Sequence, residues 1–247
     1  MDNGGTITDR LIASANIKPG ANALDIGCGP GDVTFRFAKA VGVEGKVFGV
    51  DLNPTALDKA RQTARSKGIS NITSSEQSLE ALSTLDQVFD VITCRRVLMY
   101  VFDQRAATKA LAQLLKPDGV LIIQEHDASI MRATCQMPLY QQARAWIWKT
   151  VEAEGGNIET GFSLYNLLTS AGFTDVSITA DAIVETPAQA GLTTSIVKAM
   201  LDRIEATGVA TAQDIDVDTL EVRLAAERSA NAATVIGEMV FGALARF

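Results

Sequence analysis

The sequence predicts an α/β protein with a Rossmann-like, mostly parallel seven-stranded sheet, helices on both faces and helical insertions near the C-terminus. Short apolar runs alternate with stretches of helical periodicity through the first half of the chain, as in βαβ units. A glycine-rich turn follows the first apolar run, and an acid ends the second. The 247 residues, 47% of them hydrophobic, are enough to bury a core around such a sheet.

Five apolar runs of the first half are predicted to be strands because of their length and their flanking turn residues. They lie at 22–26, 46–51, 71–75, 88–94 and 118–124. The helical periodicity between them predicts helices at 31–42, 54–67 and 103–116, after a lead-in helix at 7–17. Asn53 and Pro54 mark a helix start, and Pro117-Asp118-Gly119 is expected to separate the last of these helices from the fifth strand.

The second half of the sequence predicts a helical cap and two further strands. Residues 128–160 and 187–230 are expected to be helical and to cover the carboxyl edge of the sheet. "FSLYNLLTSAGFTDVSI" predicts a helix ended by Gly172 and then a strand, and the apolar stretch 233–246 predicts a last strand. No linker interrupts the chain, so we expect one domain over residues 1–247 with a core of about 18–180.

Composition excludes several classes of partner. The net charge of −7 and the lack of a basic stripe argue against nucleic acid. Three scattered cysteines suit neither disulfides nor a metal site, so no metal is expected. The N-terminus is polar, and no apolar run reaches the roughly 18 residues of a membrane span. The expectation is a cytoplasmic protein that contacts neither membrane nor nucleic acid.

The segment "LDIGCGPGD" at 24–32 predicts a nucleotide-binding turn between a strand and a helix. Its glycines, Gly27, Gly29 and Gly31, are spaced G-x-G-x-G, unlike the G-x-G-x-x-G of dinucleotide sites. Asp25 just before them would repel a pyrophosphate but suits the ammonium and sulfonium of S-adenosylmethionine. Asp51, about 24 residues after Gly27, is placed to accept from the ribose hydroxyls. An ordinary tight turn, and Asp51 as a helix cap, are the alternatives.

These segments and several later ones resemble the class I S-adenosylmethionine-dependent methyltransferases of the small-molecule type. "ALDIGCGPGD" is similar to their glycine motif and "VFGVDLNP" to their ribose-binding acid. "FDVITCRRVLMYV", "LLKPDGVLIIQEHD" and "LLTSAGFTDV" are similar to their fourth-strand, fifth-strand and late helix-strand segments. The resemblance covers about residues 18–180 and implies S-adenosyl-L-methionine as cofactor, with S-adenosyl-L-homocysteine as product.

The resemblance also implies which residues meet the cofactor. The expected set is Asp25, Gly27, Cys28, Gly29, Gly31, Asp51, Leu52, Gln77, Ser78, Leu79, Cys94 and Arg95. Many relatives place Gly-Asp-Ala near the end of the third strand, where this chain reads Glu76-Gln77-Ser78-Leu79. Gln77 or Ser78 would then accept from the adenine amine. A histidine pair after the fourth strand of many relatives is replaced by Met99 and Tyr100.

Residues just beyond the fourth and fifth strands are candidates for the acceptor pocket, because ligands of open α/β sheets bind at the carboxyl ends of strands. Met99, Tyr100, Gln124 and Trp146 are assigned to it. Trp146 and Trp148 lie two residues apart and face different sides of a helix, so one is expected to pack inward. Arg95 and Arg96 are candidates to pair with an anionic substrate or with Glu125 and Asp127.

His126, the only histidine, is the candidate catalytic residue. It follows "GVLIIQE" at the expected mouth of the site, and imidazole accepts a proton near neutral pH. Glu125 or Asp127 is expected to orient its ring. A structural histidine that bonds a loop carbonyl, or one that shapes the pocket, is the alternative.

The sequence therefore predicts transfer of a methyl group to a small-molecule acceptor, with a place in secondary metabolism as one setting. Two other classes stay open: a non-catalytic S-adenosylmethionine-binding regulatory module and a nicotinamide-dependent oxidoreductase. The short-chain reductase couple Tyr-x-x-x-Lys is absent, since Tyr100, Tyr140 and Tyr165 are followed at that spacing by Gln, Arg and Thr. The fourth strand also lacks the Pro-Pro-aromatic turn of amino-methylating DNA enzymes. The identity of the acceptor atom is left open.

Overall fold

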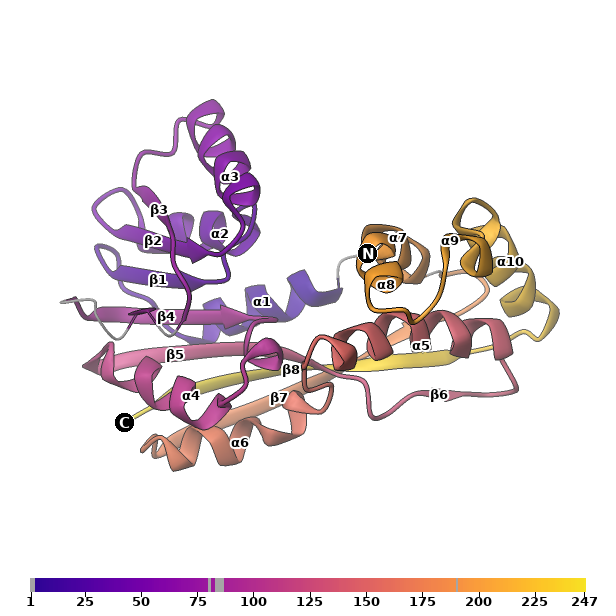
Figure 1. The fold of residues 1–247 in the computed structure, drawn as a ribbon. Helices are drawn as coiled ribbons and strands as arrows, with labels where there is room; N and C mark the ends of the chain where they lie inside the picture. The colour runs from indigo at the N-terminus through magenta and orange to yellow at the C-terminus, as the bar shows by residue number, and fades with distance from the viewer. Residues whose placement is uncertain (1–2, 80, 83–86, 190) are drawn as a thin grey trace.

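One mixed sheet organises the molecule (Figure 1). The computed structural model describes residues 3–79, 81–82, 87–189 and 191–247. The strands of this part of the chain are β1 (Asn22–Ile26), β2 (Lys46–Asp51), β3 (Ile72–Glu76), β4 (Phe89–Arg95), β5 (Leu115–Asp127), β6 (Arg132–Ala133), β7 (Asp175–Glu185) and β8 (Val235–Arg246). β3, β2, β1, β4 and β5 are parallel in that order, and β8 runs antiparallel between β5 and β7. The predicted Rossmann-like α/β fold is confirmed.

The sheet of the described residues has eight strands where the sequence predicts seven. The additional strand is β6, whose two residues pair with Val235 and Ile236 at the start of β8. Because β7 pairs with the same two residues from one edge, β6 lies on the other edge, in line with β5. The eighth strand therefore continues the position of β5 and adds no new position to the sheet.

Helical periodicity correctly predicts four helices in the first half, although the first begins and ends three to four residues earlier than predicted and the fourth ends at Gln113 instead of 116. They are α1 (Asn3–Ser14), α2 (Asp32–Val41), α3 (Pro54–Ser66) and α4 (Gln104–Gln113). The Asn53 side chain accepts a hydrogen bond from the Ala56 N–H, and Pro54 occupies the first turn of α3. Asp103 caps α4 in the same way, through the Ala106 N–H. Side-chain caps and proline thus define the starts of both helices.

The fifth strand is longer than the sequence predicts. β5 begins at Leu115, before Pro117-Asp118-Gly119, and ends at Asp127. Leu115 pairs with Phe89 of β4, and the register then shifts before Val91 pairs with Val120. The expected separator is therefore an irregularity within β5, because the pairing with β4 resumes on the far side of the turn residues.

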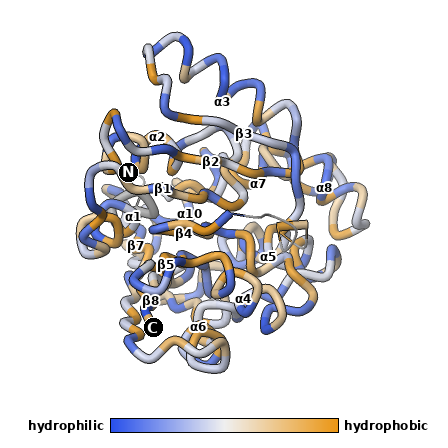
Figure 2. Tube along the Cα trace, turned by 90° about the vertical axis from the view of Figure 1, so that its left-hand side faces the viewer, coloured by the Kyte–Doolittle hydropathy of each residue, from blue (hydrophilic) through white to orange (hydrophobic). Residues whose placement is uncertain are grey.

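Two apolar cores lie on opposite faces of the sheet because side chains alternate along each strand. On β5, Leu121 and Ile123 join the core beneath α4 and α6 (Thr160–Ser170), whereas Ile122 joins the core beneath α1 and α2. Hydrophobic residues concentrate along the central strands in Figure 2, and α3 at the top of that view is largely hydrophilic. Successive side chains of β5 thus enter cores on opposite faces of the sheet.

The C-terminal half folds as a helical cap, defined here as α5 and α7–α10. Its helices are α5 (Pro138–Ala153), α7 (Thr193–Ala199), α8 (Leu201–Ala206), α9 (Ala212–Ile215) and α10 (Val217–Ala230). Helices fill most of the predicted region 187–230. The expectation of helix throughout 128–160 is wrong at its start, because residues 132–133 form β6 on β8. The cap lies beside the sheet, over the first part of β8 (Figure 1).

β8 contributes side chains to the cores of both the cap and the sheet. Its first half contributes Val235 to the apolar core of the cap, and its second half contributes Val240 and Phe241 to the two cores of the sheet. The final strand predicted at 233–246 is confirmed as Val235–Arg246. We propose that cap and sheet form one folding unit, because the strand that completes both comes last in the chain.

Deleting residues 233–247 is expected to abolish soluble folding. Val235, Val240, Phe241 and Leu244 are buried, and burial of such side chains contributes roughly 1.5–3 kcal/mol each, so the loss approaches a typical total stability of about 5–15 kcal/mol. Size-exclusion chromatography and thermal melting monitored by circular dichroism measure the outcome. A monomeric truncated protein with a cooperative melt would contradict the prediction.

Candidate active site

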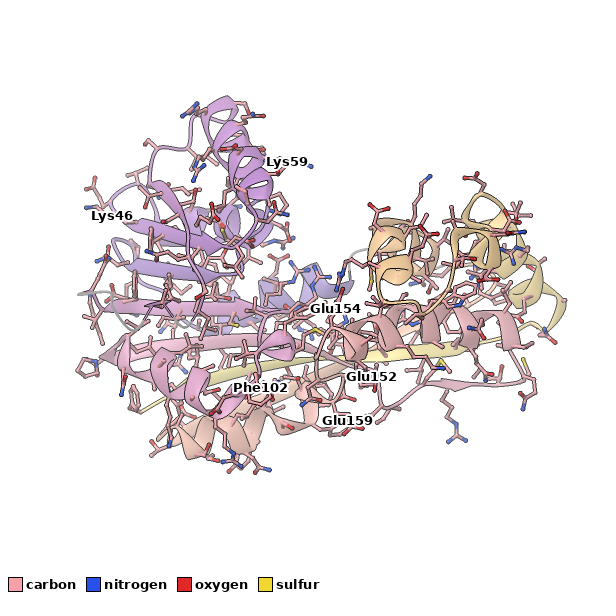
Figure 3. The ribbon with its side chains drawn as sticks, viewed as in Figure 1. Lys46, Lys59, Phe102, Glu152, Glu154 and Glu159 are labelled. Atoms are coloured by element: carbon pink, nitrogen blue, oxygen red, sulfur yellow. The ribbon has the colours of Figure 1, made fainter. Side chains whose placement is uncertain are left out.

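A cavity of about 580 Å³ lies between the carboxyl ends of three strands and the helical cap. The turn after β1 contributes Gly27 to Pro30, β4 contributes Arg95 and Arg96, and β5 contributes His126. The cap side comes from α5, α7 and α8, which contribute Arg144, Trp148 and Met200 among others. Figure 3 places the labelled Glu154 beside α8, and Lys46 at the opposite end of the sheet. This central cavity occupies the position where open α/β sheets bind ligands.

The glycine turn is held tightly against its neighbours. Gly27 has φ +66°, and a Cβ there would lie 2.2 Å from Cγ2 of Val97. The Gly29 N–H donates a hydrogen bond to Oδ2 of Asp51 at 2.8 Å, with Gly29 at φ +51°. Left-handed backbone and close approach both favour glycine. The turn therefore presents bare backbone to the cavity through Gly27, Cys28 and Gly29; Gly31 begins α2 as its N-cap.

Asp51 at the end of β2 orders the loop around the glycine turn. Besides the Gly29 contact, its Oδ1 accepts from the Asn53 N–H at 2.8 Å. The alternative that Asp51 caps α3 is wrong, because the cap is Asn53. Leu52 follows with 67% of its surface exposed, next to the turn. Neither residue lines the central cavity, so a role in cofactor binding stays a prediction for both.

Asp25 lies beneath the glycine turn, away from the cavity. Its side chain is buried and accepts a hydrogen bond from Oγ1 of Thr34 at 2.5 Å. Burial raises the pKa of Asp25 to about 7, against the lowering effects of the Thr34 hydrogen bond and the nearby Arg95. The structure therefore does not bring this carboxylate to the cavity surface where direct contact with a ligand would occur.

The segment after β3 offers one unsatisfied acceptor. Oε1 of Gln77 is buried and has no hydrogen-bond partner among the described residues, and the Gln77 N–H donates to the Asp51 carbonyl at 3.2 Å. Ser78 instead accepts from the Ala81 N–H at 3.3 Å, and Leu79 packs into the core of the sheet. Cys94 is also buried in that core, where burial raises the pKa of its thiol. Of these four residues, Gln77 has the free hydrogen-bonding capacity.

His126 is oriented by a residue far along the chain. Its Nδ1 lies 3.0 Å from Oε1 of Glu238 on β8, and its ring lines the central cavity. The other carboxylate oxygen of Glu238 accepts from Arg144 of α5. The prediction that Glu125 or Asp127 orients the ring is therefore wrong, because both of these carboxylates are bound elsewhere.

Glu125 and Asp127 stabilise the loops around the cavity. Glu125 is fully buried and accepts from the Val97 and Leu98 N–H groups at 2.9 and 2.8 Å. Burial raises the pKa of Glu125 to about 8 despite these hydrogen bonds. Asp127 accepts from the N–H groups of Ser129 and Phe162 at 3.1 and 3.3 Å. Strand alternation explains the difference: His126 points to the opposite side of the sheet from its two neighbours.

Sequence reasoning missed Glu238 and Arg144, although each left a signal. Glu238 is the one charged residue in the apolar segment "VIGEMVFGALA". Arg144 falls at helical spacing among the buried positions Tyr140, Ile147 and Val151 of α5. A charged residue inside an apolar stripe needs a buried partner of opposite charge. This requirement would have suggested that the segments of Glu238 and Arg144 pack together.

On the cap side, the tryptophan assigned to the acceptor is the wrong one of the pair. Trp146 is buried in the core of the cap, and Trp148 lines the cavity, because residues two apart on a helix point about 200° apart. Gln124 is also buried away from the cavity and accepts from Oγ1 of Thr8 at 2.6 Å. Met99 and Tyr100 do line the cavity.

Ion pairs occupy three of the cavity's arginines, one of which is Arg144 with its partner Glu238. Arg95 binds Asp32 at the start of α2 with an N–O distance of 2.7 Å, in place of the predicted pairing with Glu125 or Asp127. Arg203 of α8 binds Glu154 at the end of α5 and lies 5.8 Å from the centre of the Tyr100 ring. Arg96 is exposed and has φ 56°, which turns the backbone sharply after β4. Acidic partners therefore neutralise most of the arginines at the cavity.

In the part of the chain that the structure describes, no cluster of three or more His, Cys, Asp or Glu side chains could hold a metal ion. No described helix has the length and apolar character needed to cross a bilayer.

The sheet order, the glycine turn and the cavity at the carboxyl ends define a class I methyltransferase, an enzyme that uses S-adenosylmethionine. The chain belongs to the methyltransferase-domain family, whose pattern matches residues 17–172. The family assignment thus rests on the sheet and the glycine turn, and it ends before the helices α7–α10.

Curated relatives match about half of the chain. The chain is 39% identical over 115 residues to a ubiquinone/menaquinone biosynthesis C-methyltransferase UbiE of Shewanella piezotolerans, covering 46% of each chain. The protein of the same name from Francisella tularensis subsp. novicida is 33% identical over 123 residues, or 49% of each. The chain thus spans about half the length of the curated relatives it matches.

Solved structures share the fold at low sequence identity. YcgJ of Bacillus subtilis has a TM-score of 0.64 at 16% identity, over 98% of both chains. A phosphoethanolamine N-methyltransferase 2 of Haemonchus contortus, solved with phosphomonomethylethanolamine and S-adenosylhomocysteine, has a TM-score of 0.60 at 17% identity. Its match covers 98% of this chain and 52% of that one. These similarities establish the fold.

Replacing Asp25 by Asn is expected to stabilise the protein above neutral pH. A carboxyl whose pKa rises from 3.8 to about 7 on folding lowers the free energy of unfolding as pH increases through this window, by up to about 4 kcal/mol. Urea denaturation at a series of pH values should show the variant gaining on the wild type from about pH 4 to pH 7 and then by a constant amount. The surface variant Asp118→Asn is the control, and parallel curves for D25N and the wild type would refute the prediction.

Proposed function

We propose that this enzyme methylates a small-molecule acceptor bound in the central cavity, and that the acceptor loses a proton to His126. The observation that carries the proposal is the composition of the cavity: bare backbone of the glycine turn on one side, apolar and aromatic cap residues on the other, and His126 between them. A volume of about 580 Å³ falls in the range of small-molecule sites, roughly 300–1,000 Å³.

The cofactor end of the site is proposed to lie along the glycine turn and Asp51. The turn cannot accept side chains at Gly27, where a Cβ would collide with Val97, so a ligand meets backbone there. The orphan oxygen of Gln77 suits an amine donor such as that of adenine. Asp51 lies between these two features, and its carboxylate would exchange backbone partners for ribose hydroxyls.

The chemistry that the cofactor supplies is an electrophilic methyl group on a sulfonium. The protein then needs to exclude water, position the acceptor and remove a proton where the acceptor requires it. Ile147, Val151 and Met200 supply apolar surface for the acceptor, and Trp148 and Tyr100 supply aromatic faces. We assign the base to His126, because Glu238 holds its Nδ1 and its ring lines the cavity.

For the acceptor we propose a hydroxylated aromatic ring that is methylated at carbon or oxygen. The two curated relatives described above are ubiquinone/menaquinone biosynthesis C-methyltransferases, which are 39% and 33% identical over about half of the chain. Removal of a hydroxyl proton by His126 would raise the electron density of such a ring, at the oxygen and at the carbons beside it. The aromatic and apolar lining of the cavity fits a flat acceptor of this kind.

Calorimetric titration should show binding of S-adenosylmethionine and S-adenosylhomocysteine but not of NAD. Asp51→Ala should weaken cofactor binding by about 1.5–3 kcal/mol, the range for hydrogen bonds to a charged group, while leaving the protein folded. Asp58→Ala, which removes an exposed acid of α3 paired with Arg61, is the matched control. Binding of NAD alone would overturn the cofactor assignment, and unchanged affinity in a folded Asp51→Ala protein would overturn the ribose contact.

His126→Ala is expected to lower kcat by about 10² to 10⁴ and to leave cofactor affinity nearly unchanged, as for loss of a general base. Formation of S-adenosylhomocysteine with a panel of hydroxylated aromatic compounds gives the assay. A rise in KM with kcat retained would assign His126 to acceptor positioning instead. Wild-type kcat and KM would remove it from the mechanism.

A further inference from the structure

We infer that Glu238 is the positioning residue of His126, and that Arg144 of the cap fixes Glu238 for this task. The inference deepens the proposed function, since it rests on His126 as the base. It assigns one task to each of three side chains that come from β5, β8 and α5.

The three side chains form a continuous chain of contacts. Nδ1 of His126 lies 3.0 Å from Oε1 of Glu238, and Oε2 of Glu238 accepts from a terminal nitrogen of Arg144. The exposed fraction of the side chain is 12% for His126, 4% for Glu238 and 6% for Arg144. Both carboxylate oxygens are therefore committed, one on each side, in a nearly water-free setting.

This arrangement determines which ring nitrogen carries the proton. Arg144 cannot accept a hydrogen bond and always donates, so Glu238 faces it as an ionised acceptor. An ionised carboxylate accepts from His126 as well, which requires the proton of the neutral ring on Nδ1. The lone pair is then on Nε2, the form that a general base needs. A histidine without this partner would populate both tautomers.

The groups around Glu238 leave it little freedom. Gly237 beside it permits close packing against α5, because a Cβ at Gly237 would lie 2.3 Å from the Tyr140 hydroxyl. Tyr140 donates to Glu185 at 2.8 Å, and Glu185 lies 3.5 Å from Arg228. Glu185 at the end of β7, a second buried carboxylate, therefore has its own partners. Arg144 is the cation bound to Glu238.

The arrangement also links the cap to the chemistry. Trp148 of α5 lines the cavity one turn beyond Arg144, and its ring lies 5.4 Å from the guanidinium carbon of Arg144. An acceptor that packs against Trp148 thus contacts the helix that fixes Glu238. Acceptor binding and orientation of the base depend on the same segment.

Nitrogen NMR of the ring tests the inference without knowledge of the acceptor. His126 is the only histidine, so tag-free protein labelled with ¹⁵N-histidine gives the two ring nitrogens of one residue. At about pH 8, above the ordinary titration range of histidine, we expect the proton on Nδ1 in the wild type. A ring protonated on Nε2, or an even mixture, would overturn the inference.

Glu238→Gln is the informative variant. Arg144 still requires an acceptor, so the glutamine would turn its oxygen to Arg144 and its NH₂ group to His126. The NH₂ group donates to Nδ1, and the ring proton is then expected to move to Nε2. With the proton on that atom the base is blocked, and kcat should fall by at least tenfold while the KM of the acceptor changes less than twofold. Glu238→Asp should retain the wild-type tautomer.

Glu185→Gln provides the matched control, because Glu185 is equally buried in the same part of the protein but does not contact His126. It should leave the ring proton on Nδ1. A variant E238Q with an unchanged tautomer, or an E185Q that changes the tautomer to the same extent, would overturn the inference. If E238Q does not fold, the wild-type spectrum decides. A confirmed tautomer with full activity in H126A would refute the base while leaving the positioning geometry intact.

Discussion

The antiparallel insertion of β8 between β5 and β7 is the constraint on which the rest of the molecule depends. Its pairing with β5 runs from Ala245 opposite Leu121 to Met239 opposite Asp127, so Glu238 comes level with the end of β5. There β5 ends, and β8 continues beneath α5, where it is still paired with β6 and β7. One strand thus closes the sheet, supports the cap and delivers the carboxylate that binds His126.

Buried carboxylates around the glycine turn show how the site balances stability against function. Asp25 and Glu125 are fully buried, and burial raises their pKa values to about 7 and about 8. Each carboxylate accepts hydrogen bonds from a neighbouring segment. Asp25 accepts from the hydroxyl of Thr34 on α2, and Glu125 accepts from the N–H groups of Val97 and Leu98. Poorly solvated acids are costly on their own. Here they hold rigid two neighbouring loops at the cavity, the glycine turn and the loop after β4.

Part of the cap lies outside the family pattern. That pattern covers residues 17–172, which include the glycine turn, β1 to β6 and α5, whereas β7, β8 and α7–α10 lie beyond it. The helices outside the pattern contribute Leu192, Met200 and Arg203 to the cavity, on the side away from the glycine turn. The common fold and the helices added to it thus meet at one cavity, as expected where function lies in sites added to a common fold.

The sequence by itself determined the elements whose signals are local. The short apolar runs of β1 to β5, the glycine turn, the start of α3 at Asn53 and Pro54, and the apolar last strand all depend on neighbours in the chain, and the structure has each of them. Only the tertiary structure decided which charges meet. Glu238 reaches His126 across 112 positions and Arg144 across 94, and periodicity carries no information about such distant pairs. It likewise decided that Trp148 faces the cavity instead of Trp146, because the side of α5 that is buried depends on where β8 and α7 pack.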